Sequence, residues 1–251
     1  MYPSPVHFSR LLIVLLGLVS ILSSCTQVSE EAPVSPPFGL DASLLVDAKE
    51  SFQMNVVSPE AVRPVGTAHS EVKRSMLNSR AVINLILVQE LDQGTMRDSL
   101  VVDASTLLPI DYVNSFPNFQ SIHTTYASDG QVQSEIERMG VQTRVDTVLS
   151  GPHLDAAAFT SLLPAFPFEP TMDLRLPVFH YENGAMIFGA KVVGEEAITT
   201  CLGNHDTWKV ETESSSQVSH HWVDKQTRRV VQVIVDLGEG RKFEQTPICT
   251  E

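Results

Sequence analysis

Residues 154–166 read Leu-Asp-Ala-Ala-Ala-Phe-Thr-Ser-Leu-Leu-Pro-Ala-Phe, and this stretch decides the fold that we expect. Its large apolar side chains recur at i, i+3, i+4 and i+7, the spacing of one helix face, and they belong to Phe159, Leu162, Leu163 and Phe166. Asp155 can cap the start of a helix, and Pro164 is expected to end it. The sequence therefore predicts one short amphipathic helix at this place.

The segments on either side of this stretch have the pattern of β-strands. Asp129-Gly130 and Asn183-Gly184 are two-residue hairpin signals between apolar runs. Near the C-terminus Val231, Val233 and Val235 fall on one face of a predicted strand, and Gln232 and Asp236 fall on the other, which indicates a strand with one buried face. We expect a mainly β domain at residues 65–251, with about ten antiparallel strands and the helix packed on the sheet. Residues 41–64 are expected to form an extension ahead of it.

One short pattern occurs twice in the chain. Residues 100–107 and 221–228 both read as a strand end followed by Asp-x-x-Thr, with Asp103 and Asp224 as the first residues of the two turns. Asp and Thr side chains can bond the backbone N–H groups of a turn. Both residues are common, so coincidence is one explanation. The other is that the repeat marks two equivalent hairpins of one wrapped sheet.

The N-terminus has the pattern of an export signal. Arg10 precedes an apolar run at residues 11–22, which is too short to span a bilayer comfortably, and Leu22-Ser23-Ser24-Cys25 follows. Small residues before a cysteine resemble the lipobox of bacterial lipoproteins, in which the thiol is acylated and the peptide is cut before it. We expect residues 1–24 to be a lipoprotein signal peptide, Cys25 to be the lipid-attachment site, and residues 25–40 to be a flexible linker. An ordinary secretory signal with an incidental cysteine is the alternative.

The charge of the chain bears on its partners. The formal net charge is −13, and removal of residues 1–24 takes away Arg10 and no acidic residue, which leaves −14. An acidic surface repels the phosphate backbone of nucleic acids and anionic lipid head groups alike. We therefore expect no nucleic-acid partner, and we expect the lipidated Cys25 to be the contact with the membrane. Thr26 is not the Asp that retains some lipoproteins at the inner membrane. This favours an exported protein at the outer membrane, facing the periplasm; protein partners are unknown.

Two further cysteines, Cys201 and Cys249, remain in the mature chain. Outside the cytoplasm a pair of cysteines is free to oxidise, so they are candidates for a disulfide that would tie the C-terminal tail to the sheet. Two unpaired thiols are the alternative.

The common signatures of catalysis are missing from the sequence. It contains no Gly-x-Ser-x-Gly, no P-loop, no Gly-x-Gly-x-x-Gly after a strand and no His-Glu-x-x-His. The best metal candidate combines Cys201 and His205 with Asp206, His220 and His221, but consecutive residues of a strand point to opposite faces, so the last two cannot easily share one ion. We expect a protein that is not an enzyme and has no metal site, catalytic residue or cofactor. A metal-assisted enzyme with its site near Cys201 and His205 is the weakest of the hypotheses.

The order of several short motifs resembles a known family. The motifs are the first Asp-x-x-Thr turn with Leu108-Pro109, the Ser-Asp-Gly hairpin at 128–130, Phe-x-x-Leu-Leu at 159–163, Leu-Pro-Val-Phe at 176–179, Trp-Lys-Val at 208–210 and His-Trp-Val-Asp-x-x-Thr-Arg at 221–228. This order is similar to bacterial cell-envelope proteins of the domain of unknown function 3108 family and, more remotely, to the LolA and LolB lipoprotein carriers. The resemblance implies a strongly curved antiparallel sheet, an incomplete barrel partly closed by the helix.

These observations lead to one expected function and one rival. We expect a non-enzymatic envelope protein that binds an apolar ligand, such as a lipid, an acyl chain or a lipoprotein, in the hollow of the sheet. The lining would come from Phe159, Leu162, Leu163 and Phe166 together with Val231, Val233 and Val235. The rival is an envelope scaffold or protein-binding module whose interior is filled.

Overall fold

The computed structural model describes residues 36–214 and 217–249. The expected signal peptide, Cys25 and most of the linker lie outside these residues. Within them the chain forms one fifteen-stranded sheet. Its strands are β1 (Ala48–Val57), β2 (Val62–Leu77), β3 (Arg80–Leu91), β4 (Gly94–Asp103), β5 (Pro109–Phe116), β6 (Gln120–Tyr126), β7 (Gln131–Arg138), β8 (Val141–Val148), β9 (Leu154–Asp155), β10 (Asp173–His180), β11 (Gly184–Thr200), β12 (Gly203–Glu213), β13 (Val218–Asp224), β14 (Val230–Gly238) and β15 (Arg241–Pro247).

From β1 to β8 and from β10 to β15 successive strands are joined as antiparallel hairpins, and one long-range pairing connects the two runs. The order is β8 to β1, then β15 down to β9, so β1 and β15 join the two runs. Every pair is antiparallel except the short pairing of β9 with β10. The prediction of a mainly β domain is confirmed, whereas the number of about ten strands is wrong and the sheet is mixed. Residues 48–57, which we expected to lie in an extension, form β1 in the middle of the sheet.

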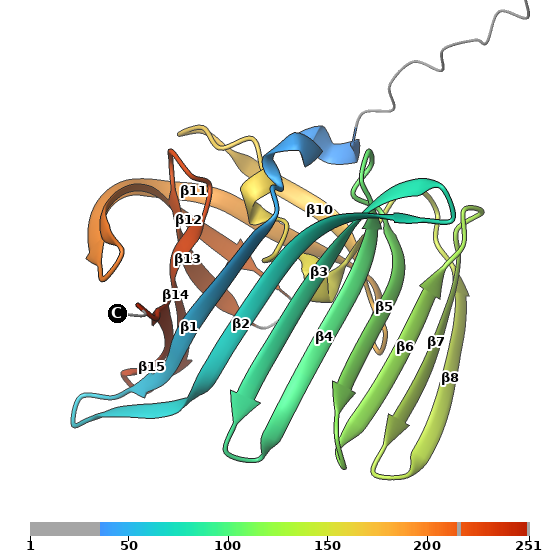
Figure 1. The fold of residues 1–251 in the computed structure, drawn as a ribbon, viewed down its shortest axis with the longest axis horizontal. Helices are drawn as coiled ribbons and strands as arrows, with labels where there is room; N and C mark the ends of the chain where they lie inside the picture. The colour runs from blue at the N-terminus through green and yellow to red at the C-terminus, as the bar shows by residue number, and fades with distance from the viewer. Residues whose placement is uncertain (1–35, 215–216, 250–251) are drawn as a thin grey trace, which may run out of the picture. The chain divides into compact units, whose positions relative to one another are not determined.

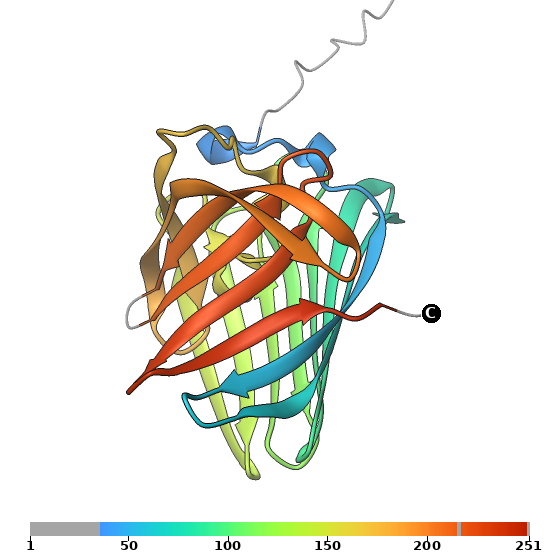
Figure 2. The ribbon, with the colours of Figure 1, turned by 90° about the vertical axis from the view of Figure 1, so that its left-hand side faces the viewer.

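The sheet is strongly curled, and its two edge strands are not paired with each other. In Figure 1, β1 to β8 make one wall, and β10 to β15 make the other. Figure 2 shows β12 to β15 crossing one side of the sheet, with β1 and β2 beside β15. Segment 154–166, drawn in yellow in Figure 1, lies between the walls.

The predicted amphipathic helix over residues 154–166 is wrong. Leu154 and Asp155 form β9, and the remainder consists of turns with two short 3₁₀ helices, η3 (Ala156–Ala158) and η4 (Leu163–Ala165). Asp155 does cap the start, because its carboxylate accepts the N–H of Ala157 at 2.7 Å. Pro164 has no N–H for a helical bond and cannot extend a regular helix, so the chain tightens into 3₁₀ geometry instead. In the described residues the other two helices are also 3₁₀, η1 (Pro37–Gly39) and η2 (Ala42–Leu44).

The side chains of this segment still form the centre of the core. Leu162, Leu163 and Phe166 are fully buried, and Phe159 is 3% exposed. The Phe159 ring packs edge-on against Phe166 and Phe188, with centroids 5.7 and 5.3 Å apart. The apolar spacing of the sequence therefore identified the buried residues correctly, although the backbone that carries them is not an α-helix.

The repeated Asp-x-x-Thr pattern corresponds to two equivalent hairpins, β4–β5 and β13–β14. Each residue of the second hairpin lies 121 positions after its equivalent in the first, and both hairpins have a bulge at the same place, after Val101 and after Trp222. The turns match as well, since Leu107 and Arg228 follow them with φ of 60° and 61°. The hairpin interpretation of the repeat is confirmed. The two halves of the sheet can thus be compared position by position.

Candidate ligand cavity

A cavity of about 390 Å³ lies inside the curled sheet, which is within the size range of small-molecule sites. Its lining comes from β4, β5, β6, β10, β11, β12 and β13, together with the start of the 154–166 segment. One part of the lining is polar and the other is aromatic. The cavity therefore offers both hydrogen-bonding groups and apolar surface to a ligand.

The polar part of the lining centres on Asp98 of β4. Its Oδ1 accepts hydrogen bonds from the Tyr112 hydroxyl at 2.7 Å and from the Asn114 side-chain amide at 2.9 Å. Gln120 donates in turn to Asn114 Oδ1 at 2.8 Å. Tyr112 and Asn114 are 4% and 3% exposed, so these contacts are held in the interior. Burial and the adjacent Asp98 charge raise the pKa of Tyr112, which keeps it a hydrogen-bond donor.

A second carboxyl group, that of Asp155, lines the same cavity. It accepts hydrogen bonds from the Tyr126 hydroxyl and from the backbone N–H of Ala157. Burial, with a smaller effect of the Asp98 charge, raises the pKa of Asp155 to about 6, against the opposing effect of these hydrogen bonds. Asp155 thus belongs to the cavity as well as to the cap that we expected from the sequence.

The aromatic part of the lining includes Phe159, Phe179 and Phe188. Tyr181 lines the cavity too and accepts a hydrogen bond from Arg138 of β7 at 3.1 Å. Arg138 also pairs with Glu182. Because β7 lies next to the edge strand β8 and Tyr181 follows β10, this contact bridges the two sides of the open sheet beside the cavity.

The polar residues of the β4–β5 hairpin can be compared with their equivalents in the β13–β14 hairpin. Ser219, Val233 and Val235 occupy the positions of Asp98, Tyr112 and Asn114 in the equivalent hairpin. The same register and the same bulge therefore form without the acidic cluster. A buried polar group that the backbone does not require is an energetic cost, so its presence points to a binding role.

The residues that we expected to line a hollow are distributed differently. Only Phe159 lines this cavity. Leu162, Leu163 and Phe166 are packed into the core, and on β14 Val231 and Val235 are buried while Val233 is partly buried, none of them lining the cavity. The sequence pattern missed Asp98, Tyr112 and Asn114, because their proximity depends on the β4–β5 register. The available signal in the sequence was that Tyr112 and Asn114, two residues apart on one strand, share a face and so place two polar side chains together.

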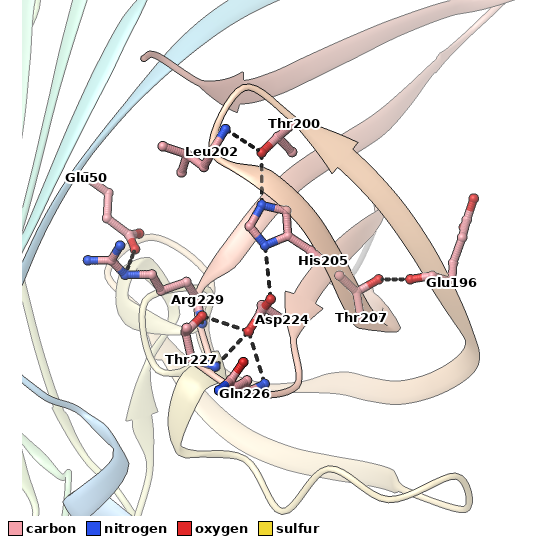
Figure 3. Close-up of polar contacts among 10 residues, drawn as sticks. All are labelled: Glu50, Glu196, Thr200, Leu202, His205, Thr207, Asp224, Gln226, Thr227 and Arg229. Carbon is pink, nitrogen blue, oxygen red and sulfur yellow. Dashed lines mark hydrogen bonds and ion pairs between the residues drawn. The ribbon is translucent and has the colours of Figure 1, made fainter. Parts of the chain in front are cut away.

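A second arrangement of polar residues lies around His205 of β12 (Figure 3). His205 Nδ1 donates to Asp224 Oδ2 at 3.0 Å, and its Nε2 lies 2.9 Å from the Thr200 hydroxyl. The Thr200 hydroxyl accepts the N–H of Leu202 at 3.1 Å, so its own proton can be donated to His205. The order Thr, His, Asp is formally that of a nucleophile, a base and an orienting acid.

The equivalent half of the sheet supports a structural role for this arrangement. Across the neighbouring strands Val82 pairs with Asp103, and Thr207 pairs with Asp224. Arg80 and His205 each lie two residues before these pairing residues, so they occupy equivalent positions. Arg80 Nε contacts Asp103 Oδ2 at 2.6 Å. The carboxylate of Asp224 also accepts the N–H of Thr227 at 2.7 Å, which matches the bond from Thr106 to Asp103 at 2.8 Å. Hydrogen bonds from the turn and from His205 lower the pKa of Asp224, although burial acts to raise it. A basic side chain on the turn Asp is thus a feature of both halves.

The candidate metal ligands do not come together. Cys201 is joined to Cys249 in a disulfide with a Cα–Cα distance of 5.9 Å. His205 contacts Asp224, and His220 contacts Glu211 at 3.3 Å. His221 is buried beside Thr212, whose hydroxyl lies 3.0 Å from its Nε2. Within the described ranges no group of three or more His, Cys, Asp or Glu residues is arranged to hold a metal ion.

The fold and the cavity together define a class: an open, curled sheet with a small polar and aromatic pocket inside it. A family model described as "Protein of unknown function (DUF3108)" matches residues 51–246, and the chain belongs to this family. Neither a curated protein nor a solved structure matches the chain. Among the residues that the structure describes, none lies in a helix long and apolar enough to cross a membrane.

Proposed function

We propose that this protein is a non-enzymatic ligand-binding protein of the bacterial cell envelope, and that its ligand is a small amphipathic molecule held in the interior cavity. The observation that carries the proposal is the hydrogen-bonded cluster of the partly buried Asp98 with the buried Tyr112 and Asn114 in a cavity of about 390 Å³, at positions where the equivalent hairpin has Ser219, Val233 and Val235. The aromatic side chains of the lining would bury the apolar part of the ligand, and the polar cluster would hold its head group.

This proposal narrows the expectation of a purely apolar ligand. An acyl chain alone would exclude water from the carboxyl groups of Asp98 and Asp155 without offering them any further hydrogen-bond donor, which is unfavourable. A ligand with one apolar end and one polar end satisfies both parts of the lining. The resemblance to lipoprotein carriers is compatible with a lipid-derived molecule of this kind.

We further propose that residues 1–24 direct export and that Cys25 carries the lipid anchor, with the domain at the outer membrane and facing the periplasm. The support is the short apolar run that ends in Leu-Ser-Ser-Cys. Metabolic labelling with a fatty acid should mark the wild-type protein and should not mark Cys25→Ala. Equal labelling of both would contradict the anchor.

Native mass spectrometry of the purified full-length protein tests the binding function. Acyl groups on Cys25 are covalent and stay with the chain, whereas a cavity ligand is released by collisional activation. We expect one non-covalent molecule per chain, and a lower occupancy in Asn114→Val. A folded protein with no releasable molecule, both as purified and after incubation with an envelope lipid extract, would contradict the proposal.

A second candidate function is that of an envelope scaffold with a filled interior. It is favoured by the complete burial of Leu162, Leu163 and Phe166, which fill much of the space that we expected to be hollow. The edge strand β8 would then be a surface for partners, since Val141 and Val148 at its ends are 66% and 70% exposed. This function predicts a dry cavity and no bound molecule.

A further inference from the structure

The charge of the cavity lining is unbalanced. Three acidic residues line the cavity, Asp98, Asp155 and Glu213, and no Lys or Arg of the described residues does; His180 also lines it, and burial lowers the pKa of its ring. Glu213 has a partner, since Arg175 Nη1 lies 2.8 Å from its carboxylate. Asp98 and Asp155 form no ion pair with a basic side chain within the described ranges. The cavity lining therefore contains two acidic side chains, Asp98 and Asp155, whose protein partners are all uncharged hydrogen-bond donors.

The geometry around Asp98 leaves one of its oxygens available. The hydrogen bonds from Tyr112 and Asn114 both end on Oδ1. Oδ2 is thus the oxygen that can accept a donor from a ligand. A charged donor is the strongest partner for a carboxylate in a partly dry site.

The other part of the lining also suits a cation. Phe159, Phe179 and Phe188 surround the same space, and aromatic rings attract a cation through their electron-rich faces. An anionic ligand would be repelled by the two carboxylates, and a neutral apolar ligand would exclude water from them without offering a further hydrogen-bond donor. A carboxylate with aromatic rings in one small cavity is an arrangement that recognises ammonium groups.

We propose that the ligand of this cavity carries an ammonium group, which contacts the Asp98 carboxylate and packs against the aromatic side chains of the lining. This inference rests on the proposed binding function and specifies the class of its ligand. The absence of a carboxylate at Ser219, the equivalent position, shows that the β-hairpin does not depend on the acidic group.

Isothermal titration of the purified full-length protein with three probes tests the inference. The probes are 2-phenylethylammonium, 2-phenylethanol and 3-phenylpropionate, which share a ring and a similar length but are positively charged, neutral and negatively charged. We expect the ammonium probe to bind about tenfold or more tightly than the alcohol, and the carboxylate to bind most weakly.

Two variants identify the group responsible. Asp98→Asn preserves an Oδ1 that can accept from Tyr112 and Asn114, and Asp98→Ser introduces the residue of the equivalent hairpin, so both are expected to fold. Each should weaken the ammonium probe by about tenfold and change the affinity for the alcohol by less than about twofold. Asp111→Asn is the matched control, because Asp111 lies on β5 but pairs with His123 outside the cavity.

The outcomes separate this inference from the function on which it rests. If the alcohol binds as tightly as the ammonium probe, or if Asp98→Asn and Asp98→Ser do not change the preference, the ammonium class is wrong and the cavity remains a binding site. A ligand released in native mass spectrometry that has no amine would also overturn it. If no probe binds and no molecule is released, the proposed function itself fails.

Discussion

Asp103 and Asp224 occupy the same position in two hairpins of one sheet, 121 residues apart. Oδ1 of each accepts the N–H and the hydroxyl of the Thr three residues later, Thr106 or Thr227, at 2.7 to 3.0 Å. Oδ2 of each contacts a basic side chain of the neighbouring strand. The two turns thus share these contacts, and in the first turn the Ser105 hydroxyl donates to Asp103 Oδ1 as well.

Removal of either turn carboxylate should destabilise the protein to a similar extent. Asp224→Ala leaves two backbone N–H groups and one hydroxyl without their acceptor, and Asp103→Ala leaves two backbone N–H groups and two hydroxyls, since Ser105 donates as well. We expect each to lower the free energy of unfolding by about 2 to 3 kcal/mol in urea denaturation. Asp92→Ala, at an exposed turn, should change it by less than about 0.5 kcal/mol. If Asp103→Ala, Asp224→Ala and Asp92→Ala all changed the free energy of unfolding by the same amount, the structural role of the repeat would be contradicted.

His221 should contribute a loss of stability at acid pH. Burial, with a smaller effect of the His220 charge, lowers the pKa of His221 to about 4, and its Nδ1 has no hydrogen-bond partner. The folded state disfavours the charged ring, so stability falls as the pH drops from about 6.5 to about 4, by about 3 kcal/mol. His221→Leu introduces the residue found at the equivalent position, Leu100, and should remove this contribution, so its pH profile of stability should differ from that of the wild type by about 3 kcal/mol between pH 6.5 and pH 4. Identical profiles in the two proteins, measured by denaturation at several pH values, would contradict the assignment.

Asp155 should act in the opposite direction. Its folded pKa of about 6 lies above the ordinary value of 3.8, so the folded state holds its proton longer than the unfolded state. Stability from this group is present below about pH 4 and is lost, by about 3 kcal/mol, as the pH rises through 6. In Asp155→Asn this loss should be absent. The contributions of Asp155 and His221 nearly cancel in the wild type, so the single variants should show steeper pH profiles of opposite sign, and unchanged profiles would refute the account.

The Cys201–Cys249 disulfide should stabilise the domain through the loop that it closes. The two residues are 48 positions apart, for which the chain-entropy relation gives about 4 kcal/mol. We expect Cys201→Ser/Cys249→Ser to unfold at a correspondingly lower urea concentration, and dithiothreitol to have little effect on it. If reduction leaves the urea midpoint of the wild-type protein unchanged, the stabilising role is contradicted.

Substitutions in the 154–166 segment should distinguish core from cavity. Leu162 is fully buried away from the cavity lining, so Leu162→Ala should cost about 2 to 5 kcal/mol of stability through the void that it leaves. Phe159 lines the cavity, so Phe159→Leu should affect ligand affinity more than stability. Urea denaturation and titration of both variants check this; a loss of binding in Leu162→Ala at conditions where it is folded would contradict the division.

The sequence predicted what depends on local patterns. The spacing of Phe159, Leu162, Leu163 and Phe166 identified core residues, and Asp155 was recognised as a cap. The same spacing misled us about the backbone, because a segment between β9 and Pro164 is too short for a regular helix. The cluster of Asp98, Tyr112 and Asn114 could not be predicted, since it depends on the register of two strands and on the direction in which the whole sheet curls.

The most direct test of the binding cavity compares the wild type with Asp98→Ser/Asn114→Val, which carries the residues of the equivalent hairpin at both positions. We expect the double variant to fold with a similar thermal midpoint and to lose the non-covalent molecule that the wild type releases in native mass spectrometry. Equal ligand occupancy in the two proteins would contradict the claim that this cavity is the binding site.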